Sequence, residues 1–187
     1  MKNLFLLWIF FCLTSVAIAQ QSGVVLKSGF QWNQPVRSSR LLSSAQRGHG
    51  FGIEIRLGAE DPMYFVVGAS YARFNIDYGF NSKHFQIQDG FGLLKALCGV
   101  ETRVLQYKKL NWRLGLDGTL NYVSDVIGDV LFEDLASGFL GLRLQSGVDI
   151  HFVSVDFSAE YGFSDLLPAN SDSKPLIFAV ELGVNFR

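Results

Sequence analysis

The chain has 187 residues and a formal net charge of −1, with 16 basic and 17 acidic side chains, so its charge indicates no nucleic-acid or polyanionic partner. It is rich in Phe (17) and Gly (19) and poor in Pro (4). Its length suits one domain, and two cysteines are too few for a disulfide framework.

The N-terminus has the three parts of a secretion signal. Lys2 supplies the positive start, residues 4–13 form an apolar core, and Ala17 and Ala19 provide a small-x-small cleavage pattern. The apolar run is shorter than the roughly 20 residues that a membrane-spanning helix needs. We therefore expect a signal peptide at residues 1–19, with residues 20–187 as the mature domain.

Cys12 raises the alternative of a lipoprotein signal, but bulky Phe11 stands where lipid modification needs a small residue. Cleavage after residue 19 leaves Cys98 alone, so no intrachain disulfide is expected. The sequence contains no cofactor motif and no His or Cys spacing typical of a metal site, and we expect no cofactor.

After the signal, apolar and polar side chains alternate. Near the C-terminus Phe178, Val180 and Leu182 share one face, whereas Glu181 and Asn185 share the other. A period of two predicts strands with two different surroundings. Eight such segments follow one another, at about residues 23–32, 50–59, 63–76, 90–104, 112–122, 140–148, 153–163 and 175–187.

Long and short connections alternate between these strands. The long ones are residues 33–49, 77–89, 123–137 and 164–174, and the short ones are residues 60–62, 106–109 and 149–151. Within the third long connection we expect a short helix at residues 130–135. This rhythm predicts an all-β, eight-stranded antiparallel up-and-down barrel with extended loops at one end and both termini at the other.

A soluble barrel with an apolar interior, such as a lipocalin, is the competing interpretation. The polar face is unusually rich in glycine, as expected of a narrow eight-stranded interior and not of a solvated surface. Its glycines are Gly52, Gly58, Gly115, Gly141, Gly147, Gly162 and Gly183. Aromatic residues gather near strand ends on the apolar face, as in an interfacial girdle, which favours a transmembrane barrel in a bacterial outer membrane.

The polar face also carries charges of both signs. We expect them to form one charge network in the lumen, because opposite charges in a confined space can pair. Arg143 is predicted at its centre, with Asp117 and Asp156 as partners. The predicted network comprises Lys27, Glu54, Arg56, Arg113, Asp117, Arg143, Asp156, Glu160 and Glu181.

The signal peptide, the eight strands and the ending LGVNFR at residues 182–187 resemble the small outer-membrane β-barrel proteins of Bacteroidota that are often labelled PorT-like. The architecture is also similar to OmpX and the OmpA barrel. The resemblance implies that Phe186 belongs to a C-terminal signal read by the barrel assembly machinery, although Arg187 follows it here.

Some eight-stranded barrels act on lipid, so catalytic residues were sought. His151, Ser154 and Asp156 could form a hydrolase trio, but the alternation puts Ser154 and Asp156 on the lumen face and His151 in a turn. His49 has no metal-ligand spacing around it, and His84 falls in a long loop. We therefore expect no catalytic residues and no enzymatic activity.

Three functions follow from this interpretation. The first is a non-catalytic outer-membrane barrel with a structural, adhesion or secretion-accessory role that presents four surface loops. The alternatives are a narrow channel for ions or small solutes and, less favoured, a lipid-modifying enzyme. The expected partners are outer-membrane lipid and lipopolysaccharide, the barrel assembly machinery and an unidentified protein, with both chain termini in the periplasm.

Overall fold

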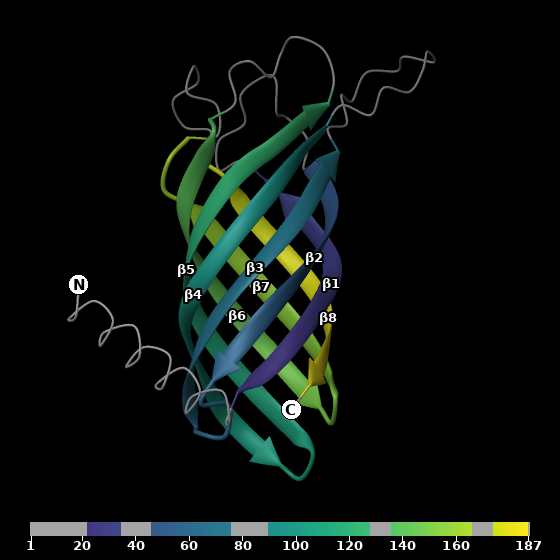
Figure 1. Cartoon of the computed structure of the whole chain (residues 1–187), viewed down its shortest axis with the longest axis vertical. Coiled ribbons are helices and arrows are strands. Elements are labelled where there is room, and N and C mark those ends of the chain that lie inside the picture. Colours follow the sequence, from purple (N-terminus) through teal and green to yellow (C-terminus); the bar gives the residue numbers. More distant parts are fainter. Residues whose placement is uncertain (1–21, 35–45, 76–89, 128–135, 166–173, 187) are drawn as a thin grey trace, which may run out of the picture.

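The computed structural model describes residues 22–34, 46–75, 90–127, 136–165 and 174–186, which form a closed barrel of eight antiparallel strands (Figure 1). Each strand pairs with its neighbours in the chain, and β1 pairs with β8 to close the ring. The predicted fold class is confirmed. The strands are β1 (Gly23–Asn33), β2 (Gln46–Leu57), β3 (Met63–Asn75), β4 (Gly90–Tyr107), β5 (Leu110–Ile127), β6 (Gly138–Ile150), β7 (Val153–Gly162) and β8 (Leu176–Phe186).

Several strands are longer than predicted. β2 begins at Gln46 and not at residue 50, and β5 continues to Ile127, beyond the predicted end at residue 122. The polar residues in these extensions do not interrupt backbone pairing. The side-chain amide of Asn33 donates a 2.9 Å hydrogen bond to Oε1 of its register partner Gln46. This side-chain bond lies inside the barrel beside the backbone ladder.

Two connections are tight turns of two residues. Lys108 and His151 each adopt the left-handed conformation, with φ of 52° and 60°. The predicted turn at residues 149–151 is therefore wrong at its start, because Asp149 still pairs with Asn111 of β5. The expected signal peptide, the helix at residues 130–135 and His84 lie outside the described residues.

The barrel has two distinct ends (Figure 1). We call "turn end" the one where the β2–β3, β4–β5 and β6–β7 connections lie, together with the start of β1 and the end of β8. The other, the "open end", is where β1, β3, β5 and β7 finish. The part of the chain that the structure describes contains no helix long and apolar enough to cross a membrane.

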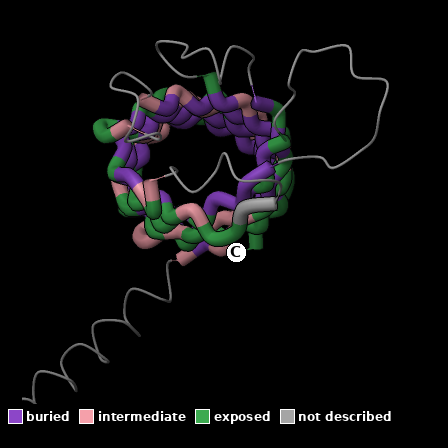
Figure 2. The backbone as a smooth tube through the Cα atoms, turned by 90° about the horizontal axis from the view of Figure 1, so that it is seen from above, coloured by how far each residue is buried: buried purple, intermediate pink, exposed green. Residues whose placement is uncertain are grey.

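Burial alternates along almost every strand, as the tube in Figure 2 shows in colour. Outward side chains are large and apolar: Phe51 is 65% exposed, Leu144 is 61% and Leu182 is 62%. Inward side chains are mostly polar, and Arg113 and Asp117 are 1% and 0% exposed. The barrel is therefore apolar outside and polar inside, the reverse of a soluble protein.

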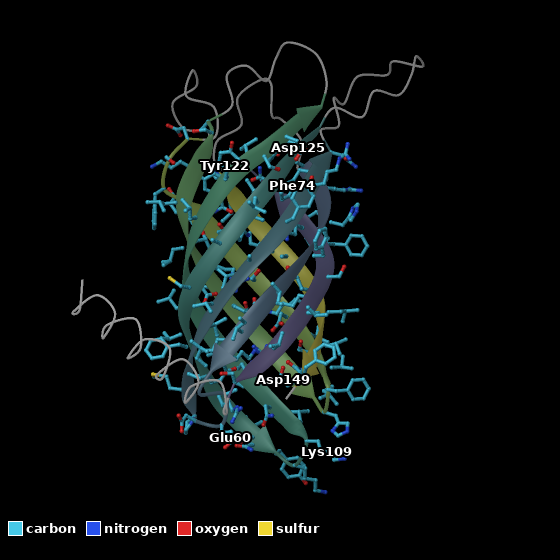
Figure 3. All side chains as sticks on the ribbon, in the orientation of Figure 1. Glu60, Phe74, Lys109, Tyr122, Asp125 and Asp149 are labelled. Atoms are coloured by element: carbon cyan, nitrogen blue, oxygen red, sulfur yellow. The ribbon has the colours of Figure 1, made fainter. Side chains whose placement is uncertain are left out.

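The interior also contains two apolar clusters, and the smaller one consists of Tyr64, Val66 and Leu97. Towards the open end, where Figure 3 labels Phe74, inward side chains from β3, β4, β6 and β8 pack together. The rings of Phe74 and Phe91 stack with their centroids 5.2 Å apart. This apolar cluster explains why the two faces of β3 and β4 are indistinct in the sequence. Its members are Ala72, Phe74, Phe91, Leu93, Phe139 and Ile177.

Candidate functional site: a charge network across the lumen

The lumen holds every charged residue that the alternation assigned to it. None of the nine side chains is more than 7% exposed, although they come from six strands. They are Lys27, Glu54, Arg56, Arg113, Asp117, Arg143, Asp156, Glu160 and Glu181. The strand period brings them to the inner wall, whereas their partners depend on how the ring closes.

The part of the network nearer the open end begins at Asp117 of β5. Its carboxylate lies 2.8 Å from the Arg143 guanidinium of β6. Arg143 also reaches Oε1 of Glu54 on β2 at 3.1 Å, and the other oxygen of Glu54 lies 2.6 Å from the Lys27 ammonium on β1. The charges thus alternate in sign from β5 to β1.

The network continues from Lys27 towards the turn end. Lys27 is 2.9 Å from Asp156 of β7, whose other oxygen is 2.6 Å from Nη2 of Arg113. Arg113 also lies 2.7 Å from Glu101 and 3.0 Å from Asp149. Arg113 therefore neutralises three carboxylates, more than any other cation in the described lumen.

Two contacts join opposite walls of the barrel. In an eight-stranded ring β2 faces β6, and Arg143 of β6 pairs with Glu54 of β2. Arg56 of β2 likewise lies 3.3 Å from Asp149 of β6. Such cross-lumen pairs close the interior, because side chains from both sides meet at its centre.

The predicted centre of the network is wrong in one respect. Arg143 pairs with Asp117 as expected, but Asp156 pairs with Lys27 and Arg113 instead. In the described lumen Arg113 has the largest number of ion-pair partners and is the better candidate for the centre.

Three buried charges lie outside the predicted set. Lys95 forms a separate ion pair with Glu160, Glu101 binds Arg113, and Asp149 binds Arg113 and Arg56. Lys95 and Glu101 follow the alternation of β4, so the sequence carried a signal for them, obscured by inward Leu93 and Leu97. Asp149 was missed because it was assigned to a turn. With these three, the buried charges in the described lumen number five cations and seven anions.

Two of the predicted anions lie apart from the main network. Glu160 is held by Lys95, Thr119 and Asn121 rather than by a member of the predicted set. Glu181 is 7% exposed and borders the same small cavity as Lys27 and Arg143. Within the described residues it forms no ion pair at salt-bridge distance.

Glycine makes room for the long charged side chains. A Cβ at Gly147 would approach Nη2 of Arg113 to 2.6 Å and would collide with Asp156. A Cβ at Gly99 would likewise collide with the backbone and the carboxylate of Asp117. These inward glycines leave the space that the ion pairs occupy, so the glycine-rich face and the charge network are parts of one packing arrangement.

Little empty space remains beside this network. The cavity bordered by Lys27, Glu54 and Arg143 has a volume of only about 10 Å³. That is about the minimum for a single water molecule. The part of the lumen between Lys27, Glu54 and Arg143 is therefore closely packed with side chains, as expected for eight strands.

The structure does not bring His151, Ser154 and Asp156 together as a catalytic trio. Ser154 and Asp156 are buried in the lumen, while His151 is exposed in the turn. The Asp156 carboxylate is held by Lys27 and Arg113. His49 is exposed on the outer face of β2, and Cys98 is an exposed free thiol on β4.

The hydroxyl group of Thr119 provides a small test of the network. It donates a 2.6 Å hydrogen bond to Glu160, which also accepts one from Asn121. We expect Thr119→Val to lower the free energy of unfolding by about 1–2 kcal/mol, because a charged acceptor loses a donor. Thr119→Ser keeps the hydroxyl and should stay close to wild type. Urea unfolding in detergent, followed by tryptophan fluorescence, compares them; equal stability of the Val and Ser variants would contradict the assignment.

No protein-family model and no curated protein sequence matches this chain. Among solved structures, Neisserial surface protein A is similar, with a TM-score of 0.56, 15% sequence identity, and coverage of 89% of this chain and 97% of that one. The outer membrane protein OprG from Pseudomonas aeruginosa gives a TM-score of 0.53 and 13% identity, covering 89% and 96%. At these identities the likeness concerns the fold, which is that of eight-stranded outer-membrane barrels.

Proposed function

We propose that this protein is a non-catalytic, non-conducting integral barrel of the bacterial outer membrane, which holds its four long connections at the cell surface for a structural, adhesion or secretion-accessory role. The observation that carries the proposal is the filled lumen. Ion pairs cross it between β2 and β6, and an apolar cluster occupies it towards the open end. An ion or solute on this path would have to separate buried opposite charges.

The outer surface supports the membrane location. Its strands present large apolar side chains to the surroundings, among them Phe51, Leu144 and Leu182. In water so much exposed apolar area would favour aggregation, whereas lipid solvates it. The two similar structures, a surface protein and an outer membrane protein by name, agree with this location.

Planar-bilayer recording tests the closed lumen. The refolded wild-type protein should give no reproducible conductance steps, because the charge network and the apolar cluster occlude the path. Its insertion is verified separately by protection from protease in liposomes of the same lipid. Regular, ion-selective openings of the inserted protein would support the narrow channel instead.

Mass spectrometry of outer-membrane lipid, with and without the protein, tests the lipid-modifying alternative.

We also propose an orientation in which the turn end faces the periplasm and both termini lie there. Long connections on the outside and short turns on the inside are the usual arrangement in such barrels. Epitope tags inserted at Ser38 or Asn81 should be reached by antibody on intact cells. A tag at Asp61 should be reached only after the outer membrane is permeabilised, and the reverse pattern would overturn the orientation.

Kinship with the PorT-like proteins of Bacteroidota is a proposal that rests on the strand pattern and the C-terminal ending. Phe186 is 54% exposed at the end of β8, on the outer face of the barrel. An aromatic side chain there is accessible to the barrel assembly machinery, which we propose as the partner during insertion. Phe186→Ser should therefore lower the folded fraction in cells, and unchanged assembly would remove the support for this signal.

A further inference from the structure

The outer face of the barrel carries strand cations at one place. Among the strand residues that the structure describes, the exposed arginines are Arg47 on β2 and Arg73 on β3, and both point outward. His49 lies between them, because it is the register partner of Arg73. We call Arg47, His49 and Arg73 the basic patch.

The basic patch lies at a defined height. Ten residues separate Arg73 from Met63, which is 64% exposed where β3 leaves the turn end. At a rise of about 3.3 Å per residue and a tilt of about 40°, this corresponds to about 25 Å along the barrel axis. An apolar band in such barrels is about 25 Å tall. The cations thus lie where the hydrocarbon ends and the lipid headgroups begin.

Aromatic side chains mark the same boundary. One step nearer the turn end, Phe51 of β2 pairs with Tyr71 of β3, and their ring centroids are 5.8 Å apart. Phe30 of β1 is the register partner of His49 and is 67% exposed. An aromatic layer with cations directly beyond it is the pattern of a membrane–water interface, seen here on β1 to β3.

The described strands place one outward carboxylate beside the basic patch. Asp125 of β5, labelled near the open end in Figure 3, accepts a 3.2 Å hydrogen bond from the Tyr71 hydroxyl and a 2.6 Å bond from Ser124. Within the described residues neither Arg47 nor Arg73 forms an ion pair. In the register the two arginines are diagonal neighbours, since Arg47 pairs with Asn75. Diagonal neighbours lie about 7–8 Å apart, so both guanidinium groups can reach one phosphate.

We propose that the basic patch binds the phosphate groups of membrane lipid in the leaflet at the open end, which is the outer leaflet in the proposed orientation. Guanidinium groups bind phosphate through paired, charge-assisted hydrogen bonds. Acyl chains of the same lipid would lie along the apolar outer face below Phe51 and Tyr71. The inference depends on the membrane location proposed above but not on whether the lumen conducts.

The test uses the refolded protein in phosphatidylcholine nanodiscs titrated with bisphosphorylated lipid A. Trp32 pairs with Arg47 in the register, so its fluorescence should report binding. We expect R47Q/R73Q to bind about 30-fold more weakly than wild type. The control K108Q/K109Q removes two exposed turn-end cations and should bind like wild type. Dephosphorylated lipid A should not distinguish the variants.

Each other outcome overturns the assignment. Equal affinity of R47Q/R73Q and wild type would mean that the basic patch does not bind lipid phosphate. An equal loss in K108Q/K109Q would indicate general charge attraction without a site. Displacement of the lipid by millimolar inorganic phosphate would make the ligand a soluble anion. Because the titration measures neither conductance nor orientation, its failure is distinguishable from failure of the proposed function.

Discussion

Arg113→Met is expected to lower the free energy of unfolding by about 3–5 kcal/mol, because it leaves buried carboxylates without their counter-charge. Arg113 is 1% exposed and lies within 3.0 Å of Glu101, Asp149 and Asp156. Methionine fills much of the volume but cannot neutralise charge. Urea titration of the protein refolded in liposomes, followed by tryptophan fluorescence and by the heat-dependent shift on gels, measures the loss.

The control is Lys109→Met, which removes an exposed cation from the turn between β4 and β5 and should change stability by less than about 0.5 kcal/mol. The loss in the free energy of unfolding for Arg143→Met should be no larger than for Arg113→Met and larger than for the control, since Arg143 neutralises two carboxylates, Asp117 and Glu54. If Arg113→Met were as mild as Lys109→Met, the network would contribute nothing to stability and the lumen would be hydrated. The same variant would then be the first to examine for conductance.

Leu144→Arg should cost about 2–4 kcal/mol in the folding free energy, because it places a charge at the middle of the lipid-facing surface. Leu144 is the central residue of β6, points outward, is 61% exposed and pairs with Leu116 of β5. Folding into phosphatidylcholine liposomes, measured by the gel shift and by urea titration, gives the difference from wild type.

The control for Leu144→Arg is the same substitution at a different depth in the membrane. Val155 also lies on the outer wall but is only two residues from the start of β7, close to the turn end. Val155→Arg should therefore cost no more than about 1 kcal/mol, because an arginine near the interface reaches the headgroups. Equal losses at Leu144 and Val155 would refute the depth assignment. No loss at either would mean that this surface does not face lipid.

The faces of the strands were predictable because successive residues of a strand point to opposite sides, and their polarity matches the surroundings on each side. Side chains at a period of two point to opposite sides, so Leu182 and Glu181 report lipid-like and lumen surroundings without any knowledge of the partner strands. The same reasoning placed all nine network residues inside the barrel. This reasoning was less reliable on β4, where the inward residues Leu93 and Leu97 each belong to an apolar cluster inside the lumen.

Strand ends were less predictable. Polar residues such as Gln46 and Arg47 resemble a loop in the sequence, yet they continue the ladder with β1 and β3. Asp149 resembles a turn residue, yet it ends β6 with its side chain inside the barrel. At the ends of the barrel, polar side chains do not prevent backbone pairing. One strand face there contacts the lumen and the other contacts headgroup-like surroundings, and both accept polar groups.

The sequence by itself determined the number of strands, their order and, on most strands, which residues face inward, because each of these is encoded locally in the alternation and in the lengths of the connections. Only the tertiary structure decided which charged side chains form ion pairs with each other in the lumen. Arg143 and Glu54 are 89 residues apart, and they meet because ring closure sets β6 opposite β2. Such a contact depends on the barrel's circumference and stagger, which no single strand encodes.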